Sequence, residues 1–393
     1  MKTKSKLGVL RIIGRERNWY YLKNIECGSL IDLFIVTLKL FFKCVKVTRI
    51  GKINAKVSRA MIKLTGLSHR RLYDLQLQNM PQDYIEVQNE KIIFEELDKF
   101  PERIISIFDL LILSSMLLKV FIFPRKRRNF LLFYWTFYTI IDKNLKYINN
   151  FPDYLFTYND QDLVTSSIVT SLRQNGTYCV VMQHGLILDS EGYFPCNSNE
   201  FWAWGTCSFD AFQSKNRNCA FFVTGRLQAD VKRFSSTQKK LFRPQQKILI
   251  AVGSRWKDIY LAIKKIRSSS LEQILDIKKF SIKYHPGTKC KIIIKILIKF
   301  YFSRINEEKG LIEQAVDKYD ILYTRNSTVL LDFLLCGKPV LLLEKRVKLG
   351  ALQSHCSTLD ELILKKNDID NKLLKQNKNR IAVLNDYLQI LPK

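Results

Sequence analysis

The residues ILYTRNSTVLLDFLLCGKPVLLL, at positions 321–343, form a complete strand–helix–strand pattern. The short apolar run Ile321–Thr324 predicts a buried strand. Ser327 or Thr328 stands where a helix N-cap belongs, and residues 329–336 have helical character. The glycine that follows predicts the helix stop, and the apolar run after Pro339 predicts the next buried strand. The stretch is therefore a βαβ unit with an anion-binding position where its helix begins.

A second motif, Tyr284-His285-Pro286-Gly287, follows the apolar run 280–284 that predicts another strand. Proline fixes the backbone after the histidine and cannot continue a helix, so we expect the imidazole to stay at the carboxyl edge of the sheet. There His285 can donate to a phosphate, and Lys289 adds positive charge. A histidine bonded inside a loop is the other interpretation of this motif alone.

Together these motifs predict a nucleotide site. A helix N-terminus with two hydroxyl residues, Ser327 and Thr328, and a His285-Pro286 turn from a neighbouring strand converge on a diphosphate. Asp332, one turn into the helix, is placed to accept hydrogen bonds from ribose hydroxyls. Hydroxyl residues at N-caps are common without any ligand, so the prediction depends on the combination.

Strand–loop–helix repetition continues on both sides of these motifs. From residue 153 to 225 short apolar strands alternate with helical or turn segments, and a second series begins at Lys247. This alternation predicts parallel, doubly wound sheets whose functional residues lie at the carboxyl ends of the strands. We expect two Rossmann-like domains facing a cleft: residues 1–235 on the acceptor side, and residues 246–393, with a helical tail from Leu359, on the nucleotide side. The polar segment 225–247 is the predicted linker. Leu7–Ile13 and Leu30–Val45 predict a first strand and a helix.

The chain of 393 residues is 47% hydrophobic and 12% aromatic, which excludes a disordered protein. Its net charge of +28 favours anionic partners: a membrane surface, phosphorylated substrates or nucleic acid. The charge is spread along the chain and no nucleic-acid module is present, so we expect no specific nucleic-acid partner. Nine cysteines without metal-type spacing predict free thiols in a reducing cytoplasm.

Residues 109–141 hold two apolar segments separated by Pro124-Arg125-Lys126-Arg127-Arg128. Two interpretations are open: a pair of core helices joined by a solvated basic turn, or a peripheral membrane patch with aromatic residues beside a cationic cluster. The apolar segments are too short, or too interrupted by charge, to span a bilayer. We expect a cytoplasmic protein associated peripherally with the anionic inner membrane.

In the first half, Gln183-His184-Gly185 ends a predicted buried strand. Glycine permits a close approach of the backbone, and the imidazole at the strand end faces the expected crevice. A hydroxyl acceptor that attacks a sugar carbon needs a base. His184 is the first candidate for that base, with Asp160, Asp189 and Glu191 as alternatives; a structural histidine is the other interpretation.

The set VVMQHG, FWAWG, FFVTG, KYHPG and RNSTVLLDFLLCGKPVLLLE resembles the two-domain GT-B glycosyltransferases of bacterial surface-polysaccharide synthesis. The pattern is most similar to the polysialyltransferase, Kdo-transferase and CDP-glycerol glycerophosphotransferase groups, which share a His-Pro and a Ser-Ser or Ser-Thr motif. The resemblance covers residues 153–344. Here the second hydroxyl residue is Thr328, and the acidic residue is Asp332 where many GT-B enzymes have Glu.

The resemblance implies nucleotide binding by His285, Ser327, Thr328 and Asp332, and an acceptor side near His184. It implies a metal-independent, inverting transfer from a nucleotide-sugar, which is a substrate rather than a cofactor, to a glycan or lipid-linked acceptor of capsule, O-antigen or a similar polymer. Three alternatives remain: a polyol-phosphate transferase acting on CDP-glycerol, a sugar 2-epimerase of the same fold, and a non-enzymatic basic protein that binds membranes or nucleic acid.

Overall fold

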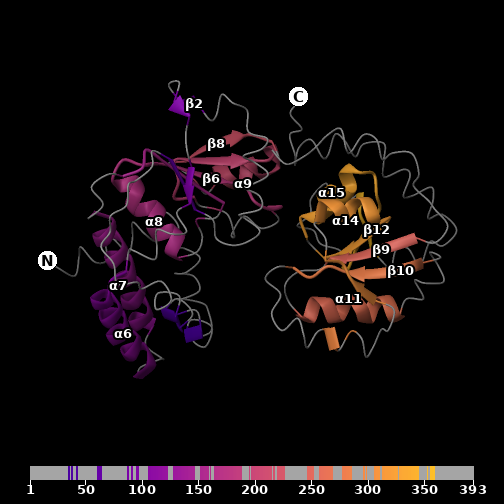
Figure 1. Cartoon of the computed structure of the whole chain (residues 1–393), viewed down its shortest axis with the longest axis horizontal. Helices are drawn as coiled ribbons and strands as arrows, with labels where there is room; N and C mark the ends of the chain where they lie inside the picture. The colour runs from indigo at the N-terminus through magenta and orange to yellow at the C-terminus, as the bar shows by residue number, and fades with distance from the viewer. Residues whose placement is uncertain are drawn as a thin grey trace. The chain divides into compact units, whose positions relative to one another are not determined.

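The computed structural model divides the chain into two compact units, Met1–Ala203 with Ser208–Leu227, and Trp204–Cys207 with Gln228–Lys393 (Figure 1). The residues that the structure describes lie, with short gaps, within 34–42, 60–63, 86–96, 105–122, 127–146, 151–187, 194–225, 246–251, 256–268, 277–285, 295–298, 305–344 and 352–358. The predicted strand at 7–13, the domain boundary between 235 and 246 and the helical tail from 359 lie outside these residues. The described residues between 34 and 42 are helical.

The first unit is built on a six-stranded sheet in which every pairing is parallel. Its order is β4-β1-β5-β6-β7-β8, with β1 (Ala60–Lys63), β4 (Phe94–Glu96), β5 (Tyr154–Thr157), β6 (Tyr178–Met182), β7 (Glu200–Ala203) and β8 (Ala220–Val223). A separate antiparallel pair consists of β2 (Glu86–Val87) and β3 (Glu90–Lys91). Since β4 lies on one side of β1 and β5 on the other, the strand order reverses between β1 and β5.

Helices stack in successive layers on one face of this sheet. α8 (Leu163–Gln174) buries Ile168 and Leu172 with Leu155 and Cys179 of the strands, and α9 (Phe209–Gln213) packs farther along the same face. A 3-10 turn, η4 (Thr206–Ser208), precedes α9. α7 (Arg127–Lys146) packs on α8, and α6 (Ile107–Ile122) lies beside α7 (Figure 1). The two apolar segments predicted around residues 109–141 are thus a helical hairpin outside the α8 layer.

The hairpin is fixed at the start of α6 by a reciprocal cap. The Asp109 carboxylate accepts hydrogen bonds from the backbone N–H and the hydroxyl of Ser106, at 3.0 and 2.7 Å, while the Asp109 N–H donates to the Ser106 hydroxyl. This is the capping-box arrangement, which satisfies donors that a helix N-terminus leaves open. Asn144 on α7 donates to the same carboxylate at 2.8 Å. The cap therefore also joins the two helices.

The second unit has a six-stranded parallel sheet with the order β11-β10-β9-β12-β13-β14. Its strands are β9 (Gln246–Ala251), β10 (Ile277–Ile282), β11 (Ile305–Glu307), β12 (Ile321–Thr324), β13 (Val340–Leu342) and β14 (Ser357–Thr358). In chain order this is 3-2-1-4-5-6, the Rossmann order, with its reversal between β9 and β12. α11 (Trp256–Ser268) lies on one face, and α14 (Ile312–Lys318) and α15 (Val329–Leu335) lie on the other (Figure 1).

The strand–helix–strand unit at 321–343 is confirmed. Every residue of β12 and of β13 is buried, which explains why each strand is a continuous apolar run. Gly337 adopts φ = 69°, a left-handed conformation that ends α15 at little steric cost. The predicted fold class of two Rossmann-like α/β domains is confirmed by the two parallel six-stranded sheets. The cleft between the domains stays a prediction.

Candidate functional site

The carboxyl edge of the second sheet, at the reversal between β9 and β12, is the candidate site. In open α/β sheets with this order, ligands bind outside the carboxyl ends of the strands where the order reverses. Thr324 ends β12 and is fully buried. Its hydroxyl donates to the Ala251 carbonyl at the end of β9, at 2.6 Å, and accepts the Ser327 N–H at 3.3 Å. Thr324 thus ties the turn before α15 to the neighbouring strand.

The two hydroxyl residues expected at the helix start are both half-buried at this edge. Thr328 occupies the N-cap position, as one of the two predicted alternatives, but its side chain makes no capping hydrogen bond. The Ser327 hydroxyl instead accepts the Val329 N–H at 3.4 Å, and the Ser327 carbonyl accepts the Leu330 N–H at 3.0 Å. Both residues therefore lie in the same turn, which positions the Ser327 hydroxyl.

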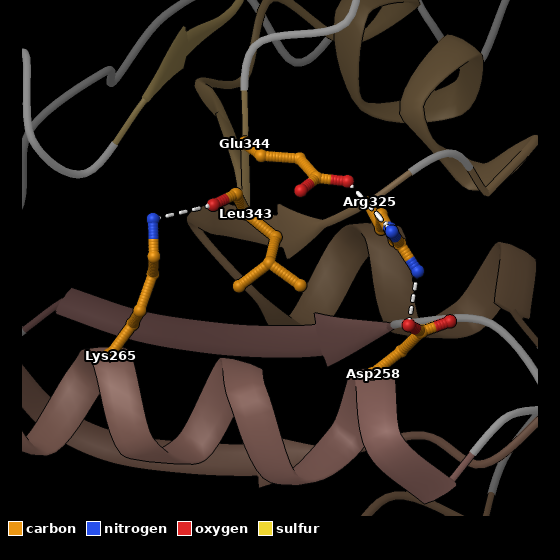
Figure 2. Close-up of polar contacts among 5 residues, drawn as sticks. All are labelled: Asp258, Lys265, Arg325, Leu343 and Glu344. Atoms are coloured by element: carbon orange, nitrogen blue, oxygen red, sulfur yellow. Dashed lines mark hydrogen bonds and ion pairs between the residues drawn. The ribbon is translucent and has the colours of Figure 1, made fainter.

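Arg325, between these hydroxyl residues and β12, joins three elements of the unit (Figure 2). Its guanidinium forms an ion pair with Asp258, in the first turn of α11, and contacts one Glu344 carboxylate oxygen through Nε and Nη2, at 2.9 and 2.8 Å. Because α11 follows β9, the Arg325–Asp258 pair bridges the reversal point. Lys265 of α11 donates to the Leu343 carbonyl at 3.0 Å, a second link between α11 and the segment after β13.

His285 lies at the same edge, after β10, and is exposed. β9 separates β10 from β12, so with a strand spacing of about 4.8 Å the ends of β10 and β12 are roughly 10 Å apart. Tyr284 directly precedes His285, and its pKa is raised to about 12, mainly by burial and secondarily by the Glu307 carboxylate. The neighbouring phenol is therefore neutral at physiological pH. Pro286 and Lys289 lie outside the described residues.

Asp332 is buried within α15, as are the helix residues from Leu330 to Leu335. It lies in the first turn, as predicted, but only 5% of its surface is exposed. A ribose hydroxyl would have to reach it from the helix start. Its role in nucleotide binding stays a prediction.

In the first unit, His184 follows β6 and is half-buried. The Gln183 N–H extends the ladder to the Trp202 carbonyl at 2.9 Å, and the Gln183 side chain donates to the Gly185 carbonyl at 2.8 Å. The glutamine therefore closes the turn around the histidine. His184 consequently has a defined place at the carboxyl edge of the sheet, as its position after a strand predicted.

Asp160 follows β5, the strand paired with β6, so the sheet brings the ends of the Asp160 and His184 strands side by side. Only 1% of Asp160 is exposed, and its carboxylate accepts the backbone N–H of Asn197 at 3.1 Å. This contact anchors the segment before β7. The other candidate bases, Asp189 and Glu191, lie outside the described residues.

Sequence reasoning assigned no role to Arg325, Asp258, Glu344 or Lys265. The sequence did hold a signal for a role of Arg325, because this residue directly follows a predicted strand and therefore lies at the carboxyl edge of the sheet. Among the described residues, no group of three His, Cys, Asp or Glu side chains gathers as metal ligands would. Metal independence stays a prediction. Within the same residues, none of the helices combines the length and apolar character needed to cross a membrane.

Comparison with known proteins finds no matching protein-family model and no matching curated protein sequence. Solved structures with a similar arrangement include S. aureus MnaA with UDP, at 12% identity and a TM-score of 0.48, covering 82% of this chain and 90% of that one. A second is the UDP-GlcNAc 2-epimerase of Neisseria meningitidis bound to UDP-GlcNAc, at 13% identity and a TM-score of 0.47. The match covers 82% of this chain and 94% of that one. The pneumococcal O-GlcNAc transferase GtfA, with UDP and GlcNAc, has 12% identity and a TM-score of 0.40, covering 63% and 56%. Likeness at this level does not specify a reaction.

Proposed function

We propose that this protein is a glycosyltransferase that moves a sugar from a nucleotide-sugar to the acceptor of a bacterial surface polysaccharide. The observation that carries the proposal is the carboxyl edge of the second sheet. There the strand order reverses, the turn after β12 presents Ser327 and Thr328, and an exposed His285 follows the strand on the other side of β9. Hydroxyl, imidazole and backbone N–H groups at such an edge are suited to a diphosphate or monophosphate.

In this proposal the second unit holds the donor and stabilises its leaving group. Ser327 and Thr328 donate to phosphate oxygens, and a protonated His285 offsets the negative charge that develops as the sugar–oxygen bond breaks. The acceptor hydroxyl forms the new bond to the anomeric carbon, the nucleotide departs with the electron pair, and the hydroxyl proton passes to His184. Direct displacement inverts the anomeric configuration.

Nucleotide binding is tested first, by thermal unfolding of the whole chain with CMP, CDP, UDP and GDP. One of them should raise Tm. Ser327→Ala and His285→Ala should each weaken that nucleotide about tenfold, the effect of losing one hydrogen bond to a charged group. Ser214→Ala is the matched control, because its exposed hydroxyl bonds only the local Ala211 carbonyl among the bonds described. Stabilisation by none of the four nucleotides would refute the proposed site.

Turnover with nucleotide-sugars and CDP-glycerol then decides among the reactions. A sugar transferred to a glycan or lipid-linked acceptor supports the proposal, while turnover of CDP-glycerol alone, or epimerisation of a UDP-sugar without acceptor, contradicts it. His184→Gln should lower kcat by about a hundredfold or more, with the donor KM within about twofold, because a general base acts only in the transition state. An unchanged kcat would remove His184 from the mechanism and leave nucleotide binding intact.

A further inference from the structure

Helix α6 presents an apolar face to solvent along its whole length. Seven large apolar residues on it expose between 46% and 74% of their surface: Ile107, Phe108, Leu111, Ile112, Leu118, Phe121 and Ile122. The ring of Phe121 also lies 5.7 Å from that of Phe34. At 3.6 residues per turn, these positions fall in one stripe over half of the helix circumference, together with Ser115 and Lys119. The opposite side of α6, with Leu113 and Val120, is buried in the core shared with α7. Sixteen residues make this stripe about 24 Å long.

Basic residues lie near one end of α6 along the chain. Lys119 is exposed in the last turn of α6, and Arg127 and Arg128 begin α7. The Asn129 side chain donates to the Lys119 carbonyl at 3.1 Å, which holds the start of α7 beside the end of α6. Asp109, the single acidic residue of α6, is buried in the cap at the opposite end. The outer face therefore carries no negative charge.

We propose that the outer face of α6 docks on an anionic lipid bilayer, with the helix lying in the membrane interface. Helices that lie in the membrane interface place Phe and Leu toward the acyl chains with Lys or Arg nearby, and the outer face of α6 with Lys119 shares these features. Protein interfaces favour Tyr, Trp, Phe, Met and Arg at their centre, and of these the stripe contains only Phe. α6 is shorter than the roughly 20 residues that span a bilayer, so it lies on the membrane rather than across it.

Two arginines in the first turn of α7 support the choice of an anionic partner. Cations at a helix N-terminus are disfavoured by the helix dipole, and that turn has no acidic residue to offset them. Anionic headgroups would supply the missing counter-charge at the end of the stripe. A neutral bilayer would receive the apolar face without relieving this repulsion, so binding should depend on anionic lipid.

The test is co-sedimentation of the purified full chain with phosphatidylcholine vesicles, with and without a quarter of phosphatidylglycerol. The wild-type chain should bind the anionic vesicles more tightly. Phe108→Glu with Leu111→Glu should weaken that binding about tenfold or more, since both residues lie in the stripe. Tyr260→Glu with Leu261→Glu is the matched control: two exposed apolar residues of α11 with the same change of charge, expected to alter binding no more than about twofold.

Arg127→Gln with Arg128→Gln tests the cationic end without touching the apolar stripe. It should weaken binding to the anionic vesicles about tenfold and leave the weak binding to neutral vesicles unchanged. Circular dichroism establishes that each variant is folded. The proposal is overturned if the wild-type chain binds neither kind of vesicle. It is equally overturned if neither the Phe108/Leu111 variant nor the Arg127/Arg128 variant binds more weakly than the wild-type chain. It is also overturned if the chain is a dimer that the α6 variants convert to a monomer while vesicle binding persists, because a second copy then covers the stripe.

Discussion

Replacing Arg325 by methionine should loosen the second unit specifically at the reversal of its strand order. Methionine keeps most of the apolar length of the side chain and removes the charge. Asp258 is only 6% exposed, so the substitution leaves a buried carboxylate without its ion-pair partner. Removing one partner of a fully buried pair costs about 3–5 kcal/mol. The Arg325 side chain is 20% exposed, which reduces the expected loss to about 2–4 kcal/mol.

The pair with Glu344 contributes much less. The Glu344 side chain is 45% exposed, and exposed ion pairs contribute at most about 1 kcal/mol. Glu344→Gln should therefore cost about 0.5 kcal/mol or less. Asp258→Asn combined with Arg325→Met should cost less than the two single changes together, with a coupling energy of about 2 kcal/mol, because the double variant leaves no buried charge unpaired.

Hydrogen exchange measured by mass spectrometry is the suitable assay, because a chain with two units need not unfold in one step. At about 1.4 kcal/mol for each factor of ten, peptides from β9 and β12 should exchange roughly 30-fold to several hundred-fold faster in Arg325→Met. Peptides from β6 in the first unit serve as the internal control and should be unchanged. The reasoning is refuted if Arg325→Met accelerates exchange no more than Glu344→Gln, or if the coupling energy is near zero.

Two further substitutions each test a contact inside one unit. Thr324→Val removes the buried hydroxyl that links β12 to β9, so it should cost about 2 kcal/mol and lower the Tm of the second unit by about 4–8 °C. Thr324→Ser keeps a hydroxyl and should recover at least half of this loss. Equal losses in the two variants would contradict the hydrogen-bonded link. Burial, with the Asp142 carboxylate second, raises the pKa of Tyr138 to about 12, while an unfolded tyrosine ionises near 10. Because the unfolded chain loses this proton first, the free energy of unfolding should decline by about 1 kcal/mol per pH unit between pH 10 and 12. Urea unfolding of Tyr138→Phe should lack this part of the decline. The same pH dependence in both proteins would show that the phenol is not buried.

The elements that sequence predicted best are those in which local and tertiary preferences agree. β12, α15 and β13 were predicted within a residue or two, because apolar runs buried on both faces alternate with glycine at a left-handed position. The same kind of signal is present at the end of α8, where Gly176 follows with φ = 94°. Strand ends also predicted which residues share an edge, so His285 and Ser327 were assigned to the same edge of one sheet.

Contacts between distant segments were not predictable in this way. Arg325 and Asp258 are 67 residues apart, and nothing in the local pattern of either shows that they meet. The apolar character of α6 was clear, but periodicity alone does not tell a stripe that faces solvent from one that faces a core. The aromatic residues of α7 illustrate the difference: Phe130, Phe133 and Phe137 are fully buried in the core that α7 shares with α6 and α8, while the apolar stripe on α6 is exposed.

Burial separates the carboxylates near the two sheet edges from the groups that can do chemistry. Asp160 is 1% exposed and holds the Asn197 backbone, and Asp258 is 6% exposed and pairs with Arg325. A buried carboxylate that already accepts a backbone N–H is engaged in a structural contact, whereas a general base must come within hydrogen-bond reach of the proton that it takes. His184 is half-buried at a strand end, so part of this residue remains accessible, whereas Asp160 is enclosed. His184 therefore stays the proposed base among the described candidates, and an acidic residue would displace it only if Asp189 or Glu191 proved essential for kcat.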